Sequence, residues 1–180
     1  MNIPKIFQPL YGEQTTKKAL YGSLLVGLLA TLFIATVFWG SLSSLALWKT
    51  ILLLLFTFDI FAGLIANFSK GTHHYYQQRT RLSHVFIVIH VYPIILMLLA
   101  GESWLTGLYL YAYMLATATL TYAIKRPNKQ KFFGFFLNLL GVSLILTVFQ
   151  PIPTYLTLIF IAFFFKLIYG FSVHHFKDNV

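Results

Sequence analysis

Two charged side chains, Asp59 and Lys166, lie inside long apolar stretches of the sequence and are its strongest candidates for chemistry. A charged group near the centre of a bilayer costs roughly 2.5 to 3.5 kcal/mol on insertion scales, so it normally faces the protein interior beside a partner. A carboxylate there can take up a proton or a cation, and an ammonium group can hold an anion. We therefore expect Asp59 and Lys166 to form an ion pair within a ligand-binding site or an ion pathway.

Other polar residues extend this expected site. Asp59, Gly63 and Asn67 follow one another at intervals of four, which places them on one helix face and leaves space beside the acid. His90 precedes Pro93 by three residues, and Pro93 has no backbone donor, so the sequence predicts a kink beside the histidine. The predicted ligand-binding or ion-pathway residues are Asp59, Lys166, His90, Asn138, Asn67 and Tyr169.

Five further histidines form an alternative candidate site near one side of the membrane: His73, His74, His84, His174 and His175. A metal-dependent membrane enzyme needs three or more ligands that converge on one point. Adjacent histidines on a helix point ~100° apart, and a haem would need paired histidines inside the membrane, where only His90 is expected. The sequence therefore predicts no metal and no other cofactor and favours a role that is not enzymatic. A metal- or haem-dependent enzyme that uses the five histidines is the alternative.

Long apolar segments must position these residues. The 180-residue chain is 58% hydrophobic and 9% charged, and its apolar runs approach the ~20 residues that a helix needs to cross ~30 Å of hydrocarbon. The sequence predicts an all-α integral membrane protein that forms a single domain of six transmembrane helices. The expected spans are approximately 20–40, 47–68, 84–100, 104–124, 132–149 and 155–173, after a tail over residues 1–19. The absence of cysteine excludes disulfides and thiolate sites.

The distribution of positive charge predicts the orientation. Lysine and arginine number three in the first tail, three in the second loop, four in the fourth loop and one in the last tail. The other loops have none apart from Lys49 at a helix edge, so both termini are expected to be cytoplasmic, in the plasma membrane. Trp39, Trp48 and Trp104 suit the outer interface. The net charge of +9 then indicates contact with anionic lipid headgroups at the cytoplasmic face, and not with nucleic acid.

This orientation predicts the depth of the candidate site. Asp59 lies about 12 residues and Lys166 about 11 residues below the outer ends of their helices, which places them level to within ~2 Å. His90 and Asn138 are expected ~5 Å lower, within reach of Asn67 and Tyr169. Together these residues predict a polar cavity that opens to the cytoplasm.

The first helix carries small residues on one face, at Ser23, Gly27, Thr31 and Ala35. Such a face allows close helix approach, and it predicts either a packing seam within the chain or a docking surface for a membrane partner or a second copy. The sequence as a whole favours a protein that binds or moves a small solute, an ion or a lipid-derived molecule through the cavity. The alternatives are the metal- or haem-dependent enzyme and a non-catalytic assembly or accessory subunit.

Overall fold

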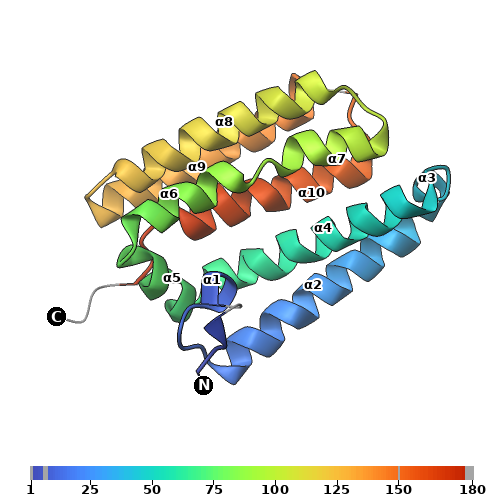
Figure 1. Ribbon diagram of the computed structural model, residues 1–180. Coiled ribbons are helices and arrows are strands. Elements are labelled where there is room, and N and C mark those ends of the chain that lie inside the picture. The colour runs from blue at the N-terminus through green and yellow to red at the C-terminus, as the bar shows by residue number, and fades with distance from the viewer. Residues whose placement is uncertain (1, 6–7, 150, 177–180) are drawn as a thin grey trace.

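The computed structural model describes residues 2–5, 8–149 and 151–176, and this part of the chain is a bundle of antiparallel helices (Figure 1). The long continuous helices are α2 (Lys17–Val37), α4 (Leu47–Asn67), α8 (Trp104–Ala123) and α9 (Pro127–Thr147). Two further apolar helices are composite: α6 (Thr80–Ile89) leads into α7 (Tyr92–Ala100), and α10 (Thr154–Phe164) continues as the π-helical segment η2 (Phe165–Phe171). The short helices are α1 (Gln8–Tyr11), α3 (Trp39–Leu42) and α5 (Lys70–Gln77).

Five helical segments are long and apolar enough to cross a membrane: Lys17–Val37, Leu47–Asn67, Thr80–Ala100, Pro127–Thr147 and Thr154–Phe171. The all-helical membrane class predicted from the sequence is thus supported, but the sixth expected span is not among these segments in the described chain. That span corresponds to α8, which has 20 residues and includes several tyrosines and threonines that lower its hydropathy. Three helices also begin three or more residues earlier than expected, at Lys17, Thr80 and Pro127, because their first turns are polar.

The two ends of the bundle differ in composition. One end, called the basic end below, carries Lys17, Lys70, Arg79, Lys125 and Lys129. The other, the tryptophan end, carries Trp39, Trp48 and Trp104. Both described chain ends lie at the basic end (Figure 1).

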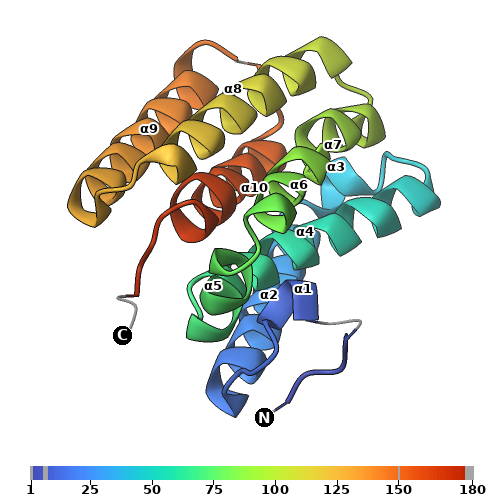
Figure 2. The ribbon, with the colours of Figure 1, turned by 60° about the vertical axis from the view of Figure 1, so that its left-hand side comes forward.

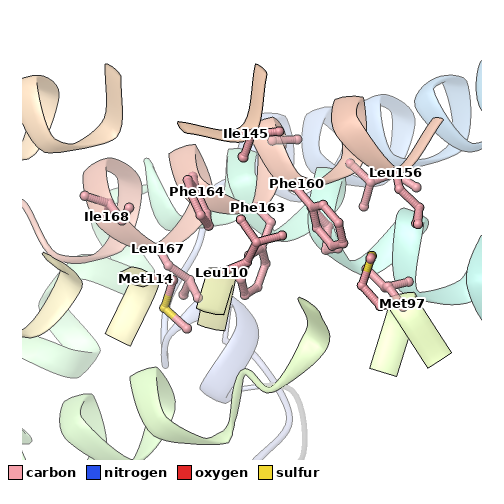
Figure 3. Close-up of a cluster of buried hydrophobic side chains, with 14 of the residues drawn as sticks. Met97, Leu110, Met114, Ile145, Leu156, Phe160, Phe163, Phe164, Leu167 and Ile168 are labelled. Atoms are coloured by element: carbon pink, nitrogen blue, oxygen red, sulfur yellow. The ribbon is translucent and has the colours of Figure 1, made fainter. Parts of the chain in front are cut away.

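The helix α10 with its extension η2 forms the centre of the bundle. It contacts α4, α7, α8 and α9, whereas α2 lies at the edge and packs mainly on α4 (Figure 2). Its side chains form the middle of the apolar core, together with residues from α7, α8 and α9 (Figure 3). The labelled members are Met97, Leu110, Met114, Ile145, Leu156, Phe160, Phe163, Phe164, Leu167 and Ile168. Lys166 therefore starts from the most buried helix of the protein.

The predicted kink beside His90 is confirmed. Helix α6 ends at Ile89, and α7 begins at Tyr92 with Pro93 in its first turn. Because proline has no amide hydrogen, the helix cannot continue its bonding pattern through this point. The break brings His90 and Tyr92 to the middle of the apolar segment, facing α4 and η2.

The small-residue face of α2 packs against α4 within the chain. A Cβ atom added at Gly27 would lie 2.8 Å from Ala62 Cβ and 3.1 Å from the Phe58 ring. Ser23, on the same face, is fully buried. The interpretation as a packing seam is confirmed, and a partner could use Gly27 only if α2 and α4 moved apart.

The expected N-terminal tail is partly folded onto the basic end. Helix α1 contacts α5, where Tyr76 donates its hydroxyl hydrogen to Pro9 O at 2.8 Å and Thr72 donates to Leu10 O at 3.0 Å. The backbones also approach closely, since a Cβ atom added at Gly71 would collide with Gln14 O. This segment therefore covers one side of the basic end.

Candidate functional site

Asp59 and Lys166 form the predicted ion pair. Lys166 Nζ lies 2.7 Å from Asp59 Oδ2 and 3.3 Å from the Asp59 carbonyl oxygen. The lysine side chain is 3% exposed, whereas the Asp59 side chain is 32% exposed. The ammonium group is therefore enclosed by protein, whereas the carboxylate is partly exposed.

Gly63 makes this pairing sterically feasible. A Cβ atom at this position would lie 2.5 Å from Lys166 Cε and 2.8 Å from Lys166 Nζ. The lysine stem thus crosses α4 directly over Gly63, one helical turn from Asp59. The space that the sequence predicted beside the acid is occupied by its partner.

His90 and Tyr92 complete the site from the break between α6 and α7. His90 Nδ1 lies 2.5 Å from Phe86 O, and because a carbonyl can only accept, Nδ1 carries the hydrogen and Nε2 is left as an acceptor. Lys166 Nζ lies 5.4 Å from the centre of the Tyr92 ring, a cation–π distance. Tyr92 is not among the residues predicted from the sequence, although its place next to Pro93 at the predicted kink was a signal for it.

These residues lie in a cavity of about 370 Å³ between α4 and α6. Its polar lining comprises Asp59, Asn67, His90, Tyr92 and Lys166, with Tyr11, Tyr75 and Tyr76 towards the basic end. The remaining walls are apolar and come from α1, α4 and α6. The volume falls in the ~300–1,000 Å³ range that is usual for small-molecule sites.

The opening of this cavity differs from the sequence expectation. Leu82, Val85 and Ile89 line it while being 42%, 46% and 58% exposed, so it opens sideways between α4 and α6. Helix α1 lies across its basic end through Pro9 and Leu10. The lining thus indicates a sideways opening, which the sequence did not predict, because α6 stands away from α4 and apolar residues of both helices wall the gap.

Of the other predicted residues, one makes a structural contact with η2 and two lie away from the cavity. Asn67 Nδ2 donates to Lys166 O at 3.0 Å and so satisfies a carbonyl of the π-helical segment, a type of segment that is frequent at functional sites. Asn138 and Tyr169 do not line the cavity. Asn138 is fully buried within α9, and neither polar atom of its side chain has a hydrogen-bond partner among the described residues. Tyr169 packs on Phe68.

The five histidines do not converge. The His73 and His174 rings lie 5.2 Å apart, but His74 bonds to the Gln78 side chain at 2.8 Å and His84 to Thr80 O at 2.8 Å. His175 bonds to Tyr169 O at 2.9 Å. Across residues 2–5, 8–149 and 151–176, no group of three histidine or acidic side chains is placed to hold a metal ion. The described part of the chain therefore does not bring three of these histidines together around one point.

Gln130, which the sequence did not single out, joins three segments at the basic end. Its side chain is fully buried; Nε2 donates to Thr121 O at 3.1 Å and to Ser172 O at 3.0 Å, and Oε1 accepts from His174 N at 2.7 Å. This amide ties α8 and α9 to the chain that leaves η2. Nothing in its sequence context signals such a role, because all three partners are backbone groups.

The fold and site define an all-helical protein with several helices of membrane-spanning length and a buried ion pair at a lateral cavity. Comparisons with protein-family models, with curated proteins and with solved structures found no match for this chain.

Proposed function

We propose that this protein binds a small, largely apolar molecule with one polar group, drawn from the bilayer into the cavity between α4 and α6. The observation that carries the proposal is the combination of apolar walls, a sideways opening and a buried ion pair at the deep end. Ligand sites in proteins are commonly of this kind, mostly apolar with a few polar groups that fix orientation. Intramembrane charges, in turn, usually mark functional sites.

The hydrogen-bonding groups favour a neutral polar group on the ligand. Lys166 already directs two contacts at Asp59, and an anionic ligand would have to displace that carboxylate and leave it unpaired in a low-dielectric site. The exposed side of Asp59 and the Nε2 atom of His90 can both accept a hydrogen bond. A hydroxyl group can donate its hydrogen to either of these acceptors without breaking the ion pair.

A substitution that blocks the opening of the cavity tests the proposal. Val85 and Val88 lie on α6 with similar exposure, 46% and 50%, but only Val85 lines the cavity. We expect Val85→Trp to reduce photolabelling of the purified protein by a photoactivatable long-chain alcohol several-fold, because the indole fills the opening. Val88→Trp should label like the unmodified protein. Equal labelling of all three proteins would show that the probe reports the general lipid-facing surface and would contradict the proposal.

We also propose that α8 crosses the membrane as a sixth span and that both termini are cytoplasmic, in the plasma membrane. Helix α8 has 20 residues, which at 1.5 Å per residue gives ~30 Å, the thickness of the hydrocarbon core. It runs antiparallel to α9, whose apolar segment is of spanning length. The concentration of lysine and arginine at the basic end supports a cytoplasmic location for that end.

Cysteine labelling tests this topology directly, because the chain has no cysteine of its own. With a maleimide that does not cross membranes, Ser103→Cys should react in intact cells, whereas Asn128→Cys should react only after permeabilisation. A reporter fused after Val180 should be active in the cytoplasm, and one inserted between Ile152 and Thr154 outside. Reaction of both cysteines from the same side would mean that α8 does not cross.

A further inference from the structure

A second hollow lies at the basic end, separate from the lateral cavity. It has a volume of about 1030 Å³ and is formed by the turn between α8 and α9, the first turns of α9 and the chain that follows η2. These segments lie at the same end of the bundle in both views (Figures 1 and 2). We call it the α8–α9 groove.

The charged side chains that line this groove, among the described residues, are all positive. Lys125, Arg126, Lys129 and Lys131 line it. The acidic residues of the described chain lie elsewhere: Glu13 pairs with Arg79, Asp59 pairs with Lys166, and Glu102 follows α7. Four cations therefore surround one hollow, and no described carboxylate lines it.

Backbone donors add to this positive charge. Arg126 precedes α9 in an extended conformation and makes no side-chain cap. Pro127 has no amide hydrogen, and Gln130 N bonds to Arg126 O at 2.8 Å. Within the described residues, the amides of Asn128 and Lys129 make no hydrogen bond, and both residues line the groove. Free amides at a helix N-terminus favour a negatively charged group.

His175 lines the groove, and its pKa depends on its surroundings there. Burial lowers the pKa of His175, and the positive charge of Lys131 lowers it further, while the bond to Tyr169 O acts in the opposite direction. Burial and the positive charge of Lys131 thus favour the neutral form of His175.

From the four cations, the hollow and the free amides, we propose that the α8–α9 groove binds a phosphate group. Phosphate combines negative charge with several acceptor oxygens, which suits lysine, arginine and backbone amide donors together. The phosphate can belong to the headgroup of an anionic phospholipid or to a phosphorylated molecule in solution, and the chemistry of recognition is the same. This site is independent of the ligand proposed for the lateral cavity.

The test compares two double variants that remove the same charge from the same end of the protein. Lys125→Gln with Lys129→Gln changes the groove, and Lys17→Gln with Lys18→Gln changes exposed lysines at the start of α2. One arm measures binding of phosphatidylglycerol, against phosphatidylcholine, to the purified full chain by native mass spectrometry. The other arm measures binding of inorganic pyrophosphate in detergent by calorimetry.

We expect the groove variant to bind phosphatidylglycerol or pyrophosphate about tenfold or more weakly, since each basic residue near an anionic group contributes about 1 kcal/mol, or roughly fivefold. The control variant should stay within about twofold of the unmodified protein. Preference for the phospholipid alone assigns the headgroup as the source, and binding of pyrophosphate alone assigns a soluble phosphate compound. Loss of binding to the same degree in both variants, or no binding in either arm, would overturn the proposal.

Discussion

Asp59→Asn and Lys166→Met are each expected to lower the free energy of unfolding by about 3 to 5 kcal/mol, and the double variant is expected to recover much of that loss. The reason is that either single change leaves an uncompensated charge in a low-dielectric site, whereas the double change leaves none. The coupling energy should clearly exceed the ~0.5 kcal/mol that is usual for distant, independent sites. Unfolding of the purified protein in detergent, followed by circular dichroism, measures all three values.

The geometry also predicts which single variant is less stable. Asp59→Asn leaves an ammonium group that is 3% exposed, whereas Lys166→Met leaves a carboxylate that is 32% exposed towards the cavity. The first should therefore lose more stability than the second. Lys49→Gln serves as the control, because Lys49 lies at the tryptophan end and its described contact is with the Trp48 ring. Additive losses for Asp59 and Lys166 would contradict the pairing.

Gln130→Leu is expected to lower the free energy of unfolding by about 3 kcal/mol or more. The change leaves Ser172 O and His174 N without the partner that each has now, and an unsatisfied buried polar group costs about 1 to 3 kcal/mol. Thr121 O also loses its bond from Gln130 but keeps the one from Ile124 N at 3.2 Å. The loss should appear as a lower midpoint of thermal unfolding in detergent. It should also loosen the attachment of the chain after η2, which hydrogen exchange would detect as faster exchange around His174.

Asn138→Leu is the matched control on the same helix. Asn138 is as deeply buried as Gln130, but its side chain has no hydrogen-bond partner among the described residues, and leucine has the same branching. We expect this variant to be as stable as the unmodified protein or more stable. A loss for Asn138→Leu as large as that for Gln130→Leu would show that hydrogen bonding does not explain the difference.

The sequence by itself determined the features that depend on position along the membrane normal. Because each helical residue rises 1.5 Å and an apolar span must match the hydrocarbon core, counting from the span ends was enough to place Asp59 and Lys166 at one level. The cost of an isolated charge in lipid then required them to meet. The break at His90 was equally local, since Pro93 lacks a donor wherever the surrounding helices lie.

Only the tertiary structure decided which neighbours surround that pair. Depth in the membrane suggested that Asn138 and Tyr169 line the cavity, but they lie away from it. Tyr92 lines the cavity, although counting residues from the span ends did not indicate it. The direction in which the cavity opens and the role of Gln130 were likewise beyond the sequence. These features depend on how each helix is rotated about its axis and on which helices pack together, and both are set by contacts between residues far apart in the chain.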